Sequence, residues 1–485
     1  MILTVGTSSI ALANSDSTSK NDQTDSFENQ LIVSVESGDS IEKSPANIMN
    51  NNNTLVNQGF QIVDSLLDNE ANTLQAEENQ QLREKVVENM GWVYLMEYDS
   101  SDYNSVEEAE TALEKSLEEE GLTVRHISQN EEVHATESTV IENSAADLHP
   151  NQAWHYEMVN APEAWEITNG SSDVSIAVLD TGIDHNHQSL SDFVRTDLGA
   201  NFAGGNNTMD YQGHGTHVAG TVASYGSVSG VMQEAALIPV KVLGDDGSGS
   251  IFGIIEGVLH AVSVDADVIN MSLGGGGFNA SFDEAVQTAV NSGTIVVAAS
   301  GNEYQSSISY PAAYESVIAV GSVTSDKMRS PFSNYGDGLE LMAPGSNIYS
   351  TVPNNGYNSL SGTSMASPHV AGVAGLLRAA DPDATVTEVR EAMNETADSV
   401  GSTLEYGNGI VDAYAAIQQL NGDNGDGGDG GDGGDDPQAP EWQAYTFYAA
   451  GDEVTYNGVL YVAQYSHLSF PGWEPPNDPF YWSVK

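Results

Sequence analysis

Three side chains with the chemistry of nucleophilic catalysis stand where elements of regular structure are expected to begin or end. Asp180 closes the apolar run "VSIAVLD", His214 opens "HGTHVAGTVAS", and Ser364 opens "SMASPHVAGVAGLL". A serine hydroxyl attacks a carbonyl carbon only weakly until an imidazole takes its proton, and a carboxylate orients that imidazole and stabilises it once charged. These residue types predict a serine nucleophile, a histidine base and an orienting aspartate.

Acyl transfer also needs hydrogen-bond donors for the oxygen on which negative charge develops. The side-chain amide of Asn302 in "AASGNE" supplies one donor, and the backbone amide of Ser364 at a helix start supplies another. Each residue alone has a structural interpretation, because Ser caps helices and Asp and Asn occupy turns. Their joint occurrence favours catalysis. His217 and His369 are interpreted as structural, and no zinc site is predicted because the chain lacks a glutamate within a histidine pair.

The elements that must position these residues lie between about residues 150 and 420. There, β-rich runs such as "AALIPVKVL", "ADVINMSL" and "GTIVVAAS" alternate with helical stretches such as 251–264 and 281–292. This alternation predicts an α/β fold, a parallel sheet flanked by helices on both faces. In such sheets, functional residues gather at the carboxyl ends of the strands.

The charge of the chain limits its partners and its surroundings. The 485 residues hold 70 Asp and Glu against 13 Lys and Arg, a net charge of -57. Nucleic acid and anionic membranes are therefore excluded as partners. Residues 151–420 alone hold 30 acidic and 6 basic residues, so the self-repulsion is not confined to a tail. Because molar salt screens such repulsion, we expect a salt-adapted, halophilic protein.

Two further features concern the compartment. The chain has no cysteine, which excludes disulfides, zinc–thiolate sites and thiol nucleophiles. The start "MILTVGTSSIALANS" has an apolar stretch and an Ala-Leu-Ala pattern typical of signal-peptidase cleavage, although no basic residue precedes Lys20. No later run is as long as the roughly 18 apolar residues of a membrane span. We expect a secreted, extracellular protein without a membrane partner.

Changes in composition divide the chain into six predicted segments. Residues 91–137 hold two apolar runs around a helix that a Ser105–Glu108 capping pair would open, which predicts a small β-α-β unit. The run "NGDNGDGGDGGDGGDD" lacks the large apolar residue that glycine-aspartate calcium repeats need, so it is interpreted as a linker. The segments are a signal-peptide remnant (1–14), a region of unclear role (15–90), a small α+β unit (91–145), the α/β domain (146–420), the linker (421–438) and a small all-β module (439–485).

Together these motifs resemble the subtilisin-type serine proteases, the subtilase family. The order Asp, His, Ser and the context Gly-Thr-Ser-Met-Ala fit that family, whereas α/β-hydrolases place their serine first in a Gly-x-Ser-x-Gly elbow. The similarity extends over about 270 residues. It implies that Asp180, His214 and Ser364 form a catalytic triad and that Asn302 is the oxyanion donor.

The resemblance also implies which residues meet a substrate. Two segments match the strands that pair with an extended peptide, and such pairing depends on backbone shape more than on side chains. Two other residues match the surroundings of the primary specificity pocket. We expect this pocket to prefer substrates with a large apolar or aromatic residue before the cleaved bond, and its glutamate to admit basic residues there. The substrate-binding residues are Gly247, Ser248 and Gly249, then Ser272, Leu273 and Gly274, then Glu303 and Ser309.

Three more implications concern maturation and ions. Residues 91–145 resemble the family's propeptide, a chaperone and inhibitor removed by self-cleavage, with the cut expected between about 137 and 150. The chemistry requires no cofactor. The family's strong calcium site is doubtful, because "HQSL" stands where relatives have His-Pro-Asp-Leu and the following loop "YGSVSGV" is short. A weak calcium or sodium site formed by carbonyls of Ala312, Tyr314 and Val317 is a hypothesis.

The tail resembles a small chitin-binding module of families five and twelve, on its Gly-Trp-Glu-Pro run and closing Trp. This resemblance implies that Trp473 contacts chitin or another insoluble polysaccharide, while Trp442, Tyr461 and Trp482 form the core. The leading hypothesis is thus a secreted, monomeric serine endopeptidase of broad specificity that cleaves proteins and is made as a zymogen inhibited by its own propeptide. A narrow-specificity processing protease and an inactive protease fold acting as a polysaccharide-binding adhesin are the alternatives.

Overall fold

The fold was analysed in a computed structural model that contains two compact units, Met1–Asn424 and Gly425–Lys485. Each unit is considered by itself. The described residues are 27–36, 44–46, 49, 53–68, 74, 79–135, 138–139 and 149–423, and in the second unit 442, 447–448, 453–456, 459–463, 467–468, 475–476 and 482–484.

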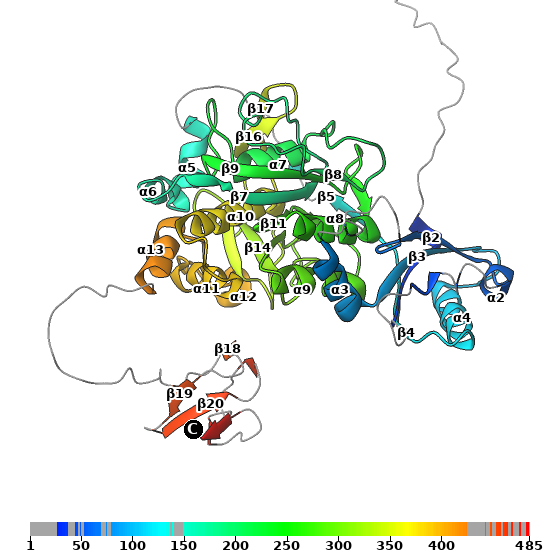
Figure 1. The fold of residues 1–485 in the computed structure, drawn as a ribbon. Coiled ribbons are helices and arrows are strands. Elements are labelled where there is room, and N and C mark those ends of the chain that lie inside the picture. The colour runs from blue at the N-terminus through cyan, green and yellow to red at the C-terminus, as the bar shows by residue number, and fades with distance from the viewer. Residues whose placement is uncertain are drawn as a thin grey trace, which may run out of the picture. The chain divides into compact units, whose positions relative to one another are not determined.

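A seven-stranded sheet forms the centre of the first unit, with the strand order β15-β14-β13-β11-β7-β9-β8 (Figure 1). Every neighbouring pair in it is parallel, which confirms the predicted α/β fold. Strand β7 lies between β11 and β9, and its carboxyl end is Asp180. The strands are β7 (Gly170–Asp180), β8 (Ala200–Asn201), β9 (Glu234–Lys241), β11 (Val268–Met271), β13 (Ile295–Ala299), β14 (Ile318–Val323) and β15 (Leu341–Pro344).

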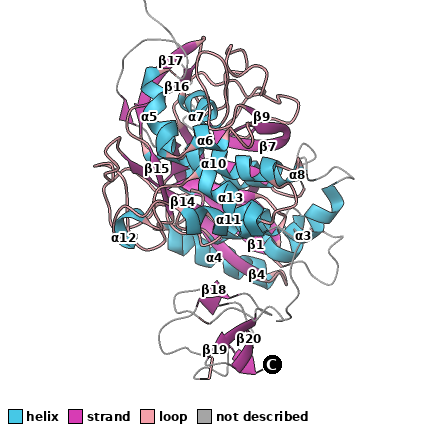
Figure 2. Cartoon of the chain, turned by 90° about the vertical axis from the view of Figure 1, so that its left-hand side faces the viewer, coloured by secondary structure: helices cyan, strands magenta, loops and turns pink. Residues whose placement is uncertain are grey.

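Helices cover both faces of this sheet because its strands are apolar on both sides. Ala177 and Leu179 of β7 pack in one core with helices α8 and α9, whereas Ile176 and Val178 pack in the other with α7, α10, α11 and α13. Figure 2 views the unit from the side on which α5, α6 and α13 lie. The helices are α5 (Pro150–Met158), α6 (Ala161–Ala164), α7 (His214–Val222), α8 (Ile251–Ser263), α9 (Ala280–Asn291), α10 (Thr363–Ala380), α11 (Val386–Thr396), α12 (Thr403–Tyr406) and α13 (Ala413–Asp423).

The N-terminal part of the first unit has its own four-stranded antiparallel sheet, with the order β2-β3-β1-β4. The structure moves the boundary that we predicted at residue 91, because the buried run "LIVSV" of β1 lies between β3 and β4. The region of unclear role, residues 15–90, therefore contributes the strands β1 and β2 to this sheet. The elements are η1 (Phe27–Asn29), β1 (Gln30–Val35), α2 (Asn53–Asn57), β2 (Phe60–Ser65), α3 (Gln80–Met90), β3 (Trp92–Tyr98), α4 (Val106–Glu119) and β4 (Val124–Gln129).

Helix α4 begins at the predicted capping residue. The Ser105 side chain accepts a hydrogen bond from the Glu108 backbone amide, whereas the Glu108 carboxylate accepts from Asn104 rather than from Ser105. Only half of the expected capping box is therefore present. The helix buries Leu113 and Leu117 against the N-terminal sheet, and its acidic face is exposed.

The second unit contains a three-stranded antiparallel sheet, β19-β20-β22, and a separate pair, β18 and β21. Its core contains Trp442, Tyr461 and Trp482, the three rings predicted to be buried. Trp473 lies outside the described residues. The strands are β18 (Phe447–Tyr448), β19 (Glu453–Tyr456), β20 (Val459–Ala463), β21 (His467–Leu468) and β22 (Trp482–Val484).

Candidate active site

Asp180 ends β7 at the carboxyl edge of the parallel sheet, where ligands of α/β folds bind. Its side chain is fully buried. Asp180 Oδ1 accepts hydrogen bonds from the Thr181 backbone amide, at 2.7 Å, and from His214 Nδ1, at 2.8 Å. A carboxylate bound to Nδ1 fixes the orientation of the imidazole and directs its other nitrogen, Nε2, away from the aspartate. The structure thus brings together two of the residues predicted from the sequence.

His214 begins α7, and the glycines on either side of it allow the close approach of the helix to β7. Gly213 has φ +114°, which an L side chain rarely adopts. A Cβ at Gly215 would collide with the Gly182 carbonyl oxygen. These two positions therefore explain why the motif reads Gly-His-Gly.

Ser364 lies in the first turn of α10, which packs against α7. Its hydroxyl donates to the Ser272 carbonyl at 2.9 Å, and the Ser272 hydroxyl donates to the Ser364 carbonyl at 2.9 Å. In a regular helix that carbonyl would accept from the amide four residues later, but Pro368 has none. The Ser272 hydroxyl therefore takes the place of the missing amide and connects the nucleophile turn to the segment that follows β11.

Asn302 follows β13 and faces the same helix start. Asn302 Oδ1 accepts from the backbone amide and from the hydroxyl of Thr363, each at 2.9 Å. Its Nδ2 is buried and has no hydrogen-bond partner among the described residues. Because buried polar groups in native proteins are nearly always paired, this donor marks a position where an acceptor from another molecule is expected.

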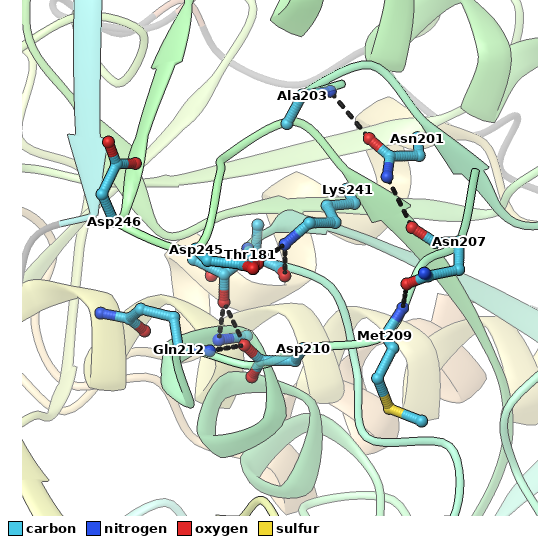
Figure 3. Close-up of polar contacts among 12 residues, drawn as sticks. Thr181, Asn201, Ala203, Asn207, Met209, Asp210, Gln212, Lys241, Asp245 and Asp246 are labelled. Carbon is cyan, nitrogen blue, oxygen red and sulfur yellow. Dashed lines mark hydrogen bonds and ion pairs between the residues drawn. The ribbon is translucent and has the colours of Figure 1, made fainter. Parts of the chain in front are cut away.

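A buried polar network holds the chain that follows Asp180 (Figure 3). Lys241 Nζ donates to the Thr181 carbonyl at 2.5 Å and to Asp245 Oδ1 at 3.0 Å. The Thr181 hydroxyl donates to Asp210 and accepts from the Gly215 amide. Burial raises the pKa of Asp210, against hydrogen bonds from Thr216 and Gly213 that lower it. Sequence reasoning did not select these residues, because an isolated Lys or Asp carries no motif.

The two segments predicted to bind an extended substrate are both strands, and a third strand lies between them. β5 (Glu132–Ala135) pairs antiparallel with β10 (Ser248–Ser250) and with β12 (Leu273–Gly274). Its last residue, Ala135, donates its backbone amide to the Gly247 carbonyl at 3.0 Å. The part of the chain before the α/β domain thus occupies the position expected for a peptide substrate.

The chain continues along another strand of the domain. β6 (Ser138–Thr139) pairs antiparallel with the end of β17 (Gly356–Ser361), which in turn pairs with β16 (Ile348–Val352). β17 ends three residues before Ser364. Residues 136 and 137, between β5 and β6, lie outside the described residues.

The residues around the predicted cation site do not fit a metal ion. The Tyr314 carbonyl accepts the Val317 amide, and the Val317 and Glu315 carbonyls accept from the Arg390 guanidinium at 3.5 and 3.1 Å. A guanidinium repels a second cation. Ala312 is buried close by. The weak site stays a prediction that these contacts do not favour, because Arg390 already supplies positive charge there.

The run "HQSL", which the sequence compares with the family's strong calcium site, makes contacts with Tyr357. The Ser189 hydroxyl lies 2.8 Å from the Tyr357 hydroxyl, and Gln188 Nε2 donates to that hydroxyl at 3.0 Å. Within the described part of the chain, no group of three or more His, Asp or Glu residues is arranged to hold a metal. These uncharged groups lack the carboxylates that calcium prefers.

Comparison with known proteins decides the family. The model of the subtilase family matches residues 171–409, and that of carbohydrate-binding module family 5/12 matches residues 441–483. Subtilisin BL of Lederbergia lenta is 46% identical over 267 residues, which cover 54% of this chain and 97% of that protein. The chain belongs to the subtilase family.

Other relatives of this subtilase agree. Subtilisin DY of Bacillus licheniformis is 45% identical over 255 residues, 51% of this chain and 92% of its own length. Alkaline elastase YaB of Bacillus sp. (strain YaB) is 44% identical over 267 residues, 54% of this chain and 69% of its own length. The subtilase is thus a serine endopeptidase with a carbohydrate-binding module. Among its described residues, no helix is both long and apolar enough to span a membrane.

Proposed function

We propose that this subtilase hydrolyses peptide bonds of proteins through an acyl-enzyme, with Ser364 as nucleophile, His214 as general base and Asp180 as the residue that orients His214. The observation that carries the proposal is the buried 2.8 Å contact between Asp180 Oδ1 and His214 Nδ1 at the carboxyl edge of the sheet. It leaves the other imidazole nitrogen, Nε2, as the atom that takes the Ser364 proton.

In the proposed reaction, Ser364 Oγ attacks the carbonyl carbon while His214 takes its proton. The tetrahedral intermediate carries an oxyanion. It is stabilised by the Nδ2 of Asn302, which has no partner among the described residues, and by the amide of Ser364. His214 then gives its proton to the leaving amine, and the carbon–nitrogen bond breaks. Water, deprotonated by His214, attacks the ester, and the proton returns to Ser364 as the acid leaves.

The first substrate is proposed to be the chain itself. β5 pairs with β10 and β12, and β6 pairs with the end of β17, three residues before Ser364, as a peptide awaiting cleavage would. We infer that the cut falls between Ala135 and Ser138, at or just before the start of the range expected from the sequence. The residues up to Ala135 would then be the inhibitory propeptide, because their last strand stays in the substrate position.

Three further properties belong to the proposal. Broad specificity is supported by the way β5 pairs as a strand, with three residue pairs to β10 and two to β12. One contact between side chains, from His134 Nδ1 to Ser248 Oγ at 3.1 Å, lies beside this pairing. Secretion is supported by the signal-peptide-like start, and salt adaptation by the net charge of -57. A strong calcium requirement is not proposed.

The second unit is proposed to hold the enzyme on chitin or a similar insoluble polysaccharide. The match to carbohydrate-binding module family 5/12 supports this function. Trp473 is the ring proposed to contact sugar. Replacing Trp473 by Ala is expected to lower retention on chitin beads while hydrolysis of a small soluble peptide stays the same, and unchanged retention would reject this ring as the binding residue.

The test of the proposed function compares the full chain with its Ser364→Ala variant, both produced in molar salt. Chain mass and casein hydrolysis are followed over time. We expect the parent to shorten by its first 135 to 137 residues and to digest casein, and the variant to do neither. A folded parent that neither shortens nor digests casein supports the adhesin alternative, and cleavage of a single site in casein supports the narrow-specificity alternative.

A further inference from the structure

A buried asparagine that the sequence did not single out organises the loop behind the oxyanion donor. Asn334 is 1% exposed. Its Oδ1 accepts from the backbone amides of Glu303, at 3.1 Å, and Gln305, at 2.9 Å, and its own backbone amide donates to the Gly301 carbonyl at 3.0 Å. The loop that carries Asn302 is thus attached to Asn334 through both the side chain and the backbone of that residue.

The two N–H groups of the same side chain bind the two residues predicted to border the primary pocket. Asn334 Nδ2 donates to Glu303 Oε2 at 2.8 Å and to Ser309 Oγ at 3.2 Å. All the hydrogen-bonding capacity of the amide group is therefore used. The three polar groups meet over Gly301, where a Cβ would collide with each of them.

This arrangement fixes a charge that is otherwise free to move. Glu303 is exposed, and an unattached glutamate side chain samples several rotamers, so that its charge has no fixed position. The bond from a buried amide holds its Oε2, while Oε1 has no hydrogen-bond partner among the described residues. Glu303 directly follows the oxyanion donor Asn302 in the chain, and the resemblance to the subtilase family implies that Glu303 and Ser309 border the primary specificity pocket.

We propose that Asn334 is a specificity-determining residue of this subtilase, which holds the Glu303 carboxylate beside Ser309 and thereby favours substrates with Lys or Arg before the cleaved bond. Asn334 touches no substrate and acts through Glu303, so it is a positioning residue. The inference rests on the proposed function, because it concerns the pocket of that active site. The inference assigns the preference for Lys or Arg to Glu303 and not to Ser309, because only the glutamate carries charge.

The test is a double-mutant cycle read as a ratio. Two peptides of one sequence, with Lys or with Phe before the cleaved bond, are assayed for kcat/KM with the self-processed parent, Glu303→Gln, Asn334→Ala and the double variant. Glu303→Gln keeps an acceptor for Asn334 and removes the charge. It is expected to lower the Lys-to-Phe ratio about threefold to fivefold, the effect of a solvent-exposed ion pair.

Asn334→Ala is expected to lower the same ratio about twofold to fivefold, and to change it no further in the Glu303→Gln background. Thermal unfolding is recorded for each variant, and Asn334→Ser, which keeps a short polar side chain, replaces Asn334→Ala in the cycle if the alanine variant does not fold. Equal losses of kcat/KM for both peptides would overturn the inference. So would the same fall in the Lys-to-Phe ratio when the Asn334 substitution is made in the Glu303→Gln background. A folded parent that cleaves neither peptide would instead overturn the proposed function on which it rests.

Discussion

Thr363 donates two hydrogen bonds to the Asn302 side chain, one from its backbone amide and one from its hydroxyl, both to Oδ1 and both at 2.9 Å. These bonds fix which side of the amide group carries Nδ2, and Nδ2 is left buried without a partner among the described residues. Such a donor costs about 1–3 kcal/mol when it is left unpaired. A substrate oxygen that becomes negative would relieve that cost most. The arrangement of Thr363 and Asn302 therefore stabilises the transition state more than the free enzyme.

Asn302→Ala is therefore expected to lower kcat by about 10²- to 10³-fold and to change KM by less than about threefold, because the bond forms fully only in the transition state. The measurement is steady-state hydrolysis of a soluble peptide by the processed enzyme. Thr363→Val is the matched control, since it removes one of the two bonds to Oδ1 and should cost much less. A raised KM with unchanged kcat would show that Asn302 binds the ground state instead.

Much of the fold and some of the site could be predicted from the sequence, for a physical reason. Asp180 and His214 end or begin elements within one parallel sheet and its covering helices, and the carboxyl ends of parallel strands meet at one edge, so their contact could be expected. The packing of Trp442 and Trp482 follows instead from the resemblance of the tail to a small chitin-binding module.

Other features depend on contacts between distant segments, which local patterns do not contain. β1 is flanked by polar residues, and only its pairing with β3 and β4 shows that it is the inner strand of a sheet. Asn334 resembles a turn residue until its bonds to Glu303 and Ser309 are seen. Arg390 is an ordinary helix residue in the sequence, and only the structure shows that it contacts the Val317 carbonyl at the predicted cation site.

The interface between the N-terminal sheet and the protease helices contains carboxylates whose protonation is favoured. Glu284 of α9 pairs with Arg125 of β4 at 2.9 Å, and His126 of β4 lies 3.5 Å from its other oxygen. Burial raises the pKa of Glu284 to about 7, although Arg125 lowers it and Asp283 raises it further. Burial and the nearby Asp64 of β2 raise the pKa of Glu256 of α8 to about 8.

The cleaved N-terminal part is therefore expected to bind more weakly as pH rises. Carboxyls with raised pKa values bind more protons in the complex than in the separated parts. The affinity of the cleaved N-terminal part for the protease domain therefore falls as pH rises from about 4.5, the ordinary pKa of a glutamate, to about 8, and it is constant above that. After self-cleavage, the delay before activity appears should shorten about tenfold from pH 5 to pH 8, a figure discounted for solvent screening. The pair Glu256→Gln and Glu284→Gln should remove most of this dependence. A delay that lengthens with pH would contradict it.

A buried histidine cluster makes a second prediction about pH. His155 Nδ1 donates to His369 Nε2 at 2.9 Å, and His369 Nδ1 donates to the Met365 carbonyl at 2.8 Å. Burial lowers the pKa of His369 to about 4 and that of His217 to about 3. His369 and His217 are therefore neutral in the folded state at pH 5, whereas the unfolded chain protonates them below about pH 6.5.

The unfolded state thus binds more protons, so these histidines lower the free energy of unfolding as pH falls from about 6.5 to about 4. His369→Gln is expected to reduce that slope by up to about 1.4 kcal/mol per pH unit. Urea unfolding at constant molar NaCl, in the Ser364→Ala background that prevents self-digestion, measures the difference between the two slopes. Identical slopes with and without His369 would mean that it titrates normally.

The acidic surface predicts a strong effect of salt. With a net charge of -57, the folded chain repels itself at low ionic strength, and near 1 M salt the screening length falls to about 3 Å. The Ser364→Ala chain is expected to have a higher Tm in 2 M NaCl than in 10 mM NaCl, by more than about 10 °C, and to lose structure on dialysis. Calorimetry at several salt concentrations measures this shift, and a Tm independent of NaCl would reject the salt-adapted interpretation.

The most direct test of the account asks which atom is the nucleophile. The processed enzyme is treated with an organophosphorus fluoride, which phosphorylates a serine only when a neighbouring base activates it, and its peptides are mapped by mass. We predict one added group on Ser364 of the parent enzyme and none on the His214→Ala variant. Labelling of another serine, or equal labelling of Ser364 without His214, would contradict the proposed triad.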